Sequence, residues 1–163
     1  MEMAEFPGIG APVGLNDEAA VRWLLESPHA VEGGVQRAKV IAVVGLSDNP
    51  DRPSYRVAQH MQSLGYRIVP VGPKGEHILG EPVYRSLPEI PFAVDVVDVF
   101  RAPDFVPGVL EDVKRMQHKP RIFWLQEGVV HAEAAADAQA YGLHVVMDRC
   151  PWKEHDRLHG RKH

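Results

Sequence analysis

Five short apolar runs of strand length recur along the chain, and stretches with helical spacing separate them. The clearest run, KVIAVVG at residues 39–45, is continuous and β-branched, which is typical of a strand buried on both faces. The alternation predicts an α/β fold, a Rossmann-like doubly wound parallel sheet of about five strands with helices on both faces. The expected strands are 39–45, 67–71, 94–100, 121–125 and 143–147, and the expected helices are 53–64, 104–116 and 131–141, with a short charged helix after Pro151.

The N-terminal residues differ from this pattern. Glycine and proline occur too often in residues 1–16 for a regular element, so we expect a mobile arm there. Asn16 or Asp17 can cap a helix that ends at Ser27-Pro28, and the following Gly33-Gly34 is expected to be a hinge. The chain is therefore divided into an arm and helix (1–34) and a Rossmann-like domain (35–163).

Composition limits the partners of this domain. The 163-residue chain has 18 Lys and Arg against 22 Asp and Glu, and this acidic balance disfavours non-specific nucleic-acid binding. The single cysteine excludes an intramolecular disulfide and a Cys-based zinc site. No signal peptide or apolar run of membrane-spanning length is present. We expect a cytoplasmic protein with no nucleic-acid or membrane partner, and the sequence identifies no protein partner.

Basic residues follow the expected strands. In an open parallel sheet, ligands bind beyond the carboxyl ends of the strands, where the strand order reverses. Arg52, Lys74 and Arg101 follow three different strands and would gather at that edge. Their position predicts an anionic ligand, and ordinary solvated loop charges are the alternative.

The loop after the first expected strand lacks the common phosphate-binding motifs. Only Gly45 opens it, and neither GxGxxG nor GxxxxGK[ST] occurs, so a Walker-type nucleotide hydrolase is not expected. Backbone N–H groups at 52–55 would begin the first crossover helix, where a pyrophosphate rests. The Ser47 and Ser54 hydroxyls can either contact such a group or cap the turn locally.

The loop after the second strand distinguishes between nucleotides. A site for NAD normally has Asp or Glu there to bind the ribose hydroxyl, whereas this chain has Gly72-Pro73-Lys74. A cation at that position favours a ribose that carries a phosphate, as in coenzyme A or NADP. Glu76 lies further on and leaves an NAD ribose as an alternative.

Several long segments resemble a known family in the same order. They are GLSDNPDRPSYRVAQHM, GYRIVPVGPKGEHILGEPVYRSLPEIP, VDVVDVFRAPDFVP, WLQEGV and GLHVVMDRC. From about residue 39 to 158 the chain is similar to the small stand-alone CoA-binding domain proteins, the YccU-like group. That group is similar in fold to the N-terminal CoA-binding domain of the succinyl-CoA synthetase α subunit.

The resemblance implies a site for coenzyme A or an acyl-CoA at the strand ends. The first loop would hold the phosphates, Lys74 would meet the 3′-phosphate or ribose, and Phe100 with Arg101 would line a channel towards the adenine and pantetheine. Gly128 would allow close approach of the thiol arm. The complete expected site is Gly45, Ser47, Arg52, Pro53, Ser54, Tyr55, Pro73, Lys74, Phe100, Arg101 and Gly128.

The chain departs from the family at Gly72, where the family often has Asn, and at Pro151-Trp152. It shows no second α/β domain and no His-containing phosphorylation segment, so the resemblance does not imply the synthetase reaction. No catalytic residue or metal ligand is assigned. We expect a CoA-binding protein without chemistry of its own. The alternatives are an NADP-dependent or other nucleotide-using enzyme, with His131 or Glu127 as acid–base group, and a structural partner-binding domain.

Other chemistry-bearing residues have simpler interpretations. Asp95 and Asp98 are three apart in a strand, so they lie on opposite faces and form no carboxylate pair. Trp124 and Trp152 are expected to pack, and His155, His159 and His163 are expected to lie in a solvated tail rather than to bind a metal. For Cys150 two interpretations stay open: a small buried hydrophobe, or a thiol that exchanges with CoA and has Arg149 beside it.

Overall fold

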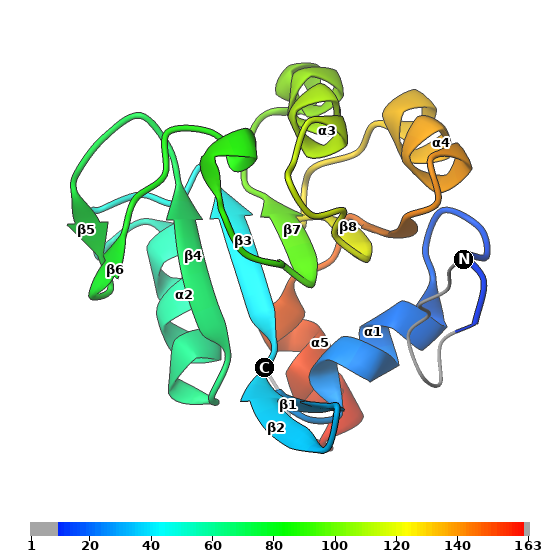
Figure 1. The fold of residues 1–163 in the computed structure, drawn as a ribbon, viewed down its shortest axis with the longest axis horizontal. Helices are drawn as coiled ribbons and strands as arrows, with labels where there is room; N and C mark the ends of the chain where they lie inside the picture. Colours follow the sequence, from blue (N-terminus) through cyan, green and yellow to red (C-terminus); the bar gives the residue numbers. More distant parts are fainter. Residues whose placement is uncertain (1–9, 162–163) are drawn as a thin grey trace.

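A five-stranded parallel sheet forms the centre of the computed structural model, which describes residues 10–161. Every neighbouring pair in this sheet is parallel, which confirms the predicted α/β, Rossmann-like architecture (Figure 1). All residues of its three interior strands are buried, as the apolar runs indicated. In spatial order the strands are β4 (Arg67–Val71), β3 (Val40–Val44), β7 (Val96–Val99), β8 (Ile122–Leu125) and β9 (His144–Met147).

Helices cover both faces of the sheet and enclose two apolar layers (Figure 1). One layer, between the sheet and helices α3 and α4, contains Val97 and Phe123; the other, beneath α1, α2 and α5, contains Val43 and Trp124. Successive strand residues therefore point into different layers, as the pleat requires. The helices are α1 (Glu18–Leu25), α2 (Pro53–Ser63), α3 (Val106–Lys114), α4 (Ala132–Ala140) and α5 (Pro151–Leu158).

Helix α1 is part of the core. Asp17 caps it, because its Oδ1 accepts the Ala20 N–H at 3.2 Å. The Asp17 N–H donates to Val145 O, and its Oδ2 lies 2.9 Å from Nδ1 of His144, so the cap is fixed to β9. Residues 10–16 form no helix or strand, and the rest of the expected arm, residues 1–9, lies outside the described residues.

Short elements appear where the sequence analysis expected none. Gly33-Gly34 is not a hinge but the turn of a hairpin, between β1 (His29–Glu32) and β2 (Val35–Ala38). Both glycines have positive φ, 56° and 80°, as a two-residue hairpin turn requires. The other short elements are β5 (His77–Ile78), β6 (Glu81–Pro82) and the 3₁₀ turns η1 (Leu87–Glu89) and η2 (Pro103–Phe105).

Turn η2 also changes a helix boundary. The α-helical part of the expected segment 104–116 begins only at Val106, so Asp104 is not its cap. Proline occupies the first turn of both η2 and α3, where its missing N–H costs no hydrogen bond. No helix within residues 10–161 has the length and apolar character needed to cross a bilayer.

Candidate functional site

The strand order reverses at β3, which has β4 on one side and β7 on the other. At this point the loops after β3 and β7 come very close. Gly45, at φ +88°, begins the first loop, and a Cβ there would lie 2.3 Å from the carbonyl oxygen of Phe100. Only glycine fits this crossing, which brings the loop after β3 against Phe100 and Arg101.

A cleft of about 590 Å³ opens over the carboxyl ends of the strands. Its lining comes from the start of α2, from the residues that follow β7 and β8, and from the start of α5. We call it the main cleft. It is lined by Asp51, Pro53, Arg56, Val57, Phe100, Arg101, Gln126, Glu127, Val129, Cys150, Trp152 and Lys153.

The main cleft is well suited to an anion. Helices α2 and α5 both begin at it with a proline, and neither has a side-chain cap on its free N–H groups. Arg56 and Arg101 line it, and within residues 10–161 neither is held in an ion pair. The Arg101 guanidinium instead lies 4.0 Å from the ring centre of Phe105.

A smaller cleft of about 360 Å³ lies on the α3 side of Arg101. Arg101 lines both clefts and so marks where they meet. Arg85 lines the second cleft and donates to the carbonyl oxygens of Gly72 at 3.0 Å and Gly75 at 2.7 Å, which holds the loop after β4 in place. No sequence pattern points to Arg85, because it follows the unpredicted β5–β6 hairpin.

The structure brings part of the predicted site together. Pro53, Phe100 and Arg101 line the main cleft, Pro73 lines the second, and Gly45 lies beneath them. Arg52, Tyr55 and Lys74 line neither of these two clefts, and Arg52 and Lys74 are exposed beside them. Gly128 is exposed in a turn, where its N–H donates to Asp148 Oδ1 at 2.7 Å.

The two serines of the first loop have local roles. Buried Ser54 accepts the Ser47 N–H on its Oγ at 3.0 Å, and the Ser47 Oγ accepts the Asn49 N–H at 3.0 Å. Both hydroxyls therefore accept the local hydrogen bonds of the capping interpretation, and their contact with a phosphate stays a prediction. Their contribution to the site is to shape the loop that carries Asp51 and Pro53 into the main cleft.

Several residues that line the main cleft lie outside the predicted site, among them Arg56, Gln126, Trp152 and Lys153. Arg56 lies one turn inside α2, so its position relative to the cleft depends on the helix orientation. Trp152 has a dual position: it lines the cleft and stacks on His60 with ring centres 4.0 Å apart. Lys153 pairs with Glu127 at 2.9 Å. Gln126 directly follows a strand, and that position is the only signal in the sequence that could have identified it.

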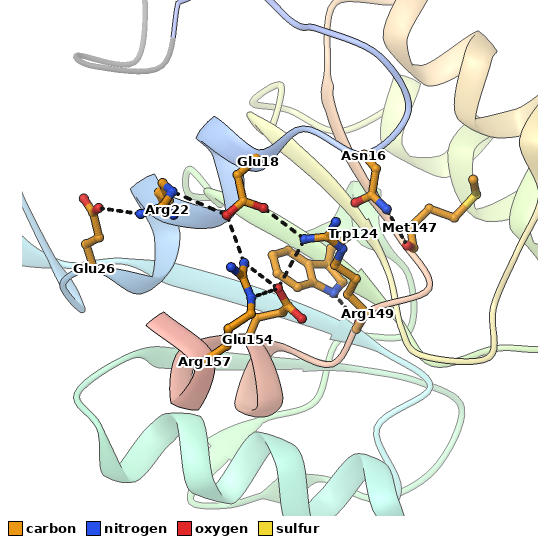
Figure 2. A network of polar contacts seen from close by, with 9 residues as sticks. All are labelled: Asn16, Glu18, Arg22, Glu26, Trp124, Met147, Arg149, Glu154 and Arg157. Atoms are coloured by element: carbon orange, nitrogen blue, oxygen red, sulfur yellow. Dashed lines mark hydrogen bonds and ion pairs between the residues drawn. The ribbon is translucent and has the colours of Figure 1, made fainter. Parts of the chain in front are cut away.

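Arg149 acts as a structural residue. Its guanidinium binds Glu18 at 3.1 Å and Glu154 at 3.2 Å, and Arg157 joins the same two carboxylates (Figure 2). The Nε1–H of buried Trp124 donates to the Arg149 carbonyl oxygen at 2.7 Å, which fixes the segment after β9 against β8. The network ties α1 to α5 and keeps Arg149 occupied away from Cys150.

Asp95, just before β7, and Asp98, within β7, lie in separate environments, as predicted. Asp95 binds the Arg37 guanidinium through both oxygens, at 2.7 and 2.9 Å, and accepts the Val40 N–H. Asp98 is buried, and its Oδ1 has no hydrogen bond to any described residue. Desolvation raises the pKa of Asp98 well above its usual value, which favours the neutral acid.

The expectation of a solvated C-terminal tail is wrong for His155, which is buried in α5. The His155 and His159 rings lie 4.1 Å apart, and His163 lies outside the described residues. Between residues 10 and 161, no group of three or more His, Cys, Asp or Glu side chains is arranged to hold a metal ion.

The fold, with two clefts at its switch point, defines a Rossmann-like α/β domain. The chain belongs to the CoA-binding domain family, whose model matches residues 39–156. The uncharacterized protein YneT of Bacillus subtilis is 44% identical over 116 residues, which are 71% of this chain and 84% of YneT.

Solved structures and larger enzymes share the domain. A hypothetical protein from Pyrococcus horikoshii superposes with a TM-score of 0.74 at 33% identity, covering 98% of this chain and 100% of that one. An ADP-forming acetate–CoA ligase of Archaeoglobus fulgidus is 25% identical over 120 residues, 69% of this chain but only 18% of the ligase. The chain thus corresponds to a small part of that enzyme.

Proposed function

We propose that the protein binds coenzyme A or an acyl-CoA at the main cleft and acts as a binding protein in the cytoplasm. The observation that carries this proposal is the convergence of two uncapped helix N-termini with Arg56 and Arg101 on one cleft. Membership of the CoA-binding domain family supplies the identity of the anion. The cleft volume is also within the range of small-molecule sites.

The two clefts suggest how the ligand lies. We place the pyrophosphate at the start of α2, where the first N–H groups have no partner within the helix. The adenosine end extends past Arg101 into the second cleft, with its 3′-phosphate towards Lys74 and Arg85. The pantetheine arm then follows the main cleft between Phe100 and Trp152. Arg52, at the α2 N-cap, remains a predicted phosphate contact.

The two candidate acid–base groups have structural partners, which favours binding over catalysis. The His131 Nδ1 accepts the Ala134 N–H at 3.0 Å and caps α4. Glu127 lines the main cleft but is paired with Lys153. A general acid or base needs a proton to give or take at the reacting group, and these contacts compete with that role.

Calorimetric titration with CoA, dephospho-CoA, NADP, NAD and ATP tests the proposal. We expect CoA to bind most tightly, and dephospho-CoA to bind at least about tenfold more weakly because it lacks a phosphate that forms charge-assisted hydrogen bonds. Preference for NADP would favour the enzyme hypothesis. Absence of binding to all five compounds would favour a structural domain.

Arginine variants locate the site. Arg56→Ala and Arg101→Ala should each weaken CoA binding by about 1.5–3 kcal/mol, the usual cost of a lost charged hydrogen bond. Arg67→Ala is the control, because this exposed arginine begins β4 and lies at the amino ends of the strands, whereas the clefts lie at their carboxyl ends. Equal affinities for all three variants would remove the main cleft from the proposal.

A further inference from the structure

Gln126 and Cys150 lie on neighbouring strand ends in the main cleft. Gln126 follows β8 and Cys150 closely follows β9, and these two strands are paired. The N–H groups of Asp148 and Arg149 both donate to Leu125 O, and Trp124 holds the Arg149 carbonyl. The segment that carries Cys150 is therefore fixed beside the end of β8, and both side chains line the same cleft.

The buried side chain of Gln126 lacks a hydrogen bond to its oxygen. The residue is only 6% exposed, and its Oε1 accepts no hydrogen bond from any residue that the structure describes. A buried acceptor without a donor is costly, so such a group in a cleft indicates a donor supplied by the ligand. The pantetheine arm of CoA carries amide N–H groups close to its terminal thiol, and these are suitable donors.

Cys150 provides a sulfur at the same wall. It is 6% exposed, lines the main cleft and occupies the N-cap of α5, where the positive end of the helix dipole stabilises negative charge on an attacking sulfur. Lys153, in the first turn of α5, is a cation that lines the same cleft, and it pairs with Glu127 at 2.9 Å. Arg149 does not line this cleft, and its guanidinium binds Glu18 and Glu154 (Figure 2).

We propose that Gln126 holds the end of the pantetheine arm and that Cys150 forms a mixed disulfide with CoA by exchange with CoA disulfide. This inference rests on the proposed function and deepens it. The protein would then bind CoA reversibly as the thiol and covalently when CoA is oxidised.

The exchange is balanced without a further oxidant. The Cys150 thiolate attacks one sulfur of CoA disulfide, the bond between the two CoA sulfurs breaks, and a new bond joins Cys150 to one CoA. The second CoA leaves as a thiolate and takes up the proton that Cys150 lost. Glu127 and Lys153 are each 51% exposed, so this wall of the cleft reaches solvent, where the leaving half can remain. A small-molecule thiol reverses the reaction.

Intact-mass analysis with CoA disulfide tests the step. The chain has one cysteine, so a single adduct with the mass of CoA less two hydrogen atoms is expected, and dithiothreitol should remove it. At equal concentrations, glutathione disulfide should react at least tenfold more slowly, because it lacks the nucleotide that the clefts bind. No adduct, or equal rates with both disulfides, would overturn the proposal.

A matched pair of variants tests the role of Gln126. Gln126→Leu should slow adduct formation with CoA disulfide about fivefold, the effect of one lost hydrogen bond, and leave the rate with glutathione disulfide unchanged. Gln36→Leu, at an exposed position on the β1–β2 hairpin, should react like the original protein. Equal rates for the two variants with CoA disulfide would refute the assignment of Gln126.

Titration of the original protein with reduced CoA under dithiothreitol separates the two proposals. Binding of reduced CoA without an adduct from CoA disulfide would leave the proposed function intact and refute the disulfide. If the protein neither binds reduced CoA nor forms an adduct with CoA disulfide, the CoA site itself is refuted.

Discussion

Gly45 determines whether the two loops of the switch point can meet. Its φ of +88° is costly for other residues, and an added Cβ would contact backbone that cannot move aside easily. We expect Gly45→Ala to destabilise the fold by about 2–4 kcal/mol and to weaken CoA binding at least tenfold, because Phe100 and Arg101 must shift. Thermal melts and calorimetry measure the two effects.

Gly80→Ala is the matched control for this substitution. Its φ is +78°, but a Cβ there has no neighbour within 4 Å. The control should therefore lose only the conformational part of the stability, about 1 kcal/mol, and retain CoA binding. If both variants behave alike, the close approach to Phe100 has no consequence for the site.

The buried carboxyl group of Asp98 should make the stability of the fold depend on pH. Burial raises its pKa in the folded state, so the folded protein retains a proton that the unfolded chain releases above about pH 4. The resulting stabilisation is complete below the unfolded pKa and is lost as the pH rises towards the folded pKa. Asp98→Asn cannot lose a proton, so its Tm should exceed that of the original protein at pH 7 by about 2–4 °C or more.

Melting curves between pH 4 and pH 8 check this sign. The Tm difference between Asp98→Asn and the original protein should shrink as the pH falls towards 4. A Tm of Asp98→Asn below the original at pH 7 would mean that an ionised Asp98 stabilises the fold.

The sequence predicts which loops form the site better than which side chains enter it. Arg52, Lys74 and Arg101 all follow strands, yet only Arg101 lines the main cleft. Phe105 positions Arg101, while Arg56 reaches the cleft through the orientation of α2, and neither contact can be derived from local spacing. The missing partner of Gln126 is likewise a property of its three-dimensional surroundings.

Helices and strands likewise differ in how well the local sequence predicts them. The five apolar runs of strand length form the central sheet, because burial on both faces imposes an apolar pattern that is visible in the local sequence. The β1–β2 hairpin has little such pattern: Val31 and Val35 beside its turn are 68% and 66% exposed. Its Gly33-Gly34 signal is present in the sequence, but two glycines also suit a hinge, and only the paired strands distinguish the two.

Two charged contacts join the hairpin to the sheet, Arg37 with Asp95 and Glu32 with Arg121, and Asp95 is the buried carboxylate of the two. Asp95, before β7, binds Arg37 of β2 through two hydrogen bonds and also accepts the Val40 N–H. Asp95→Ala should lower the free energy of unfolding by about 2–4 kcal/mol, because it leaves a half-buried guanidinium and a buried N–H without their acceptor. Urea denaturation measures the loss.

Glu32→Ala is the control for this contact, since exposed Glu32 is the other carboxylate partner of Arg37 and also pairs with Arg121 at 3.4 Å. An exposed ion pair contributes little, so this variant should lose less than about 1 kcal/mol. Equal losses for Glu32→Ala and Asp95→Ala would show that the buried contact contributes no more to the free energy of unfolding than the exposed one.

The whole molecule assembles its cleft from four distant segments. Residues 51–57, 100–101, 126–129 and 150–153 meet because parallel strands place all their carboxyl ends at one edge. The strand order makes this assembly predictable. The closure by α5 is not predictable from the strand order, because it depends on how Arg149 and Arg157 bind both Glu18 of α1 and Glu154 of α5 (Figure 2). Helix α1 therefore supports one wall of the site from outside it.

This role of α1 leads to a prediction about the expected boundary at residue 35. Val21, Leu24 and Leu25 of α1 are fully buried, and such side chains contribute about 1.5–3 kcal/mol each. Their loss is comparable with the 5–15 kcal/mol that typically stabilises a domain. We expect a chain of residues 35–163 to lack a cooperative thermal transition and to lose CoA binding. A chain of residues 10–163, which keeps α1, should melt and bind like the full protein. Circular dichroism and calorimetry compare the two chains; a cooperative melt at an unchanged Tm for residues 35–163 would instead establish residues 1–34 as a separate unit.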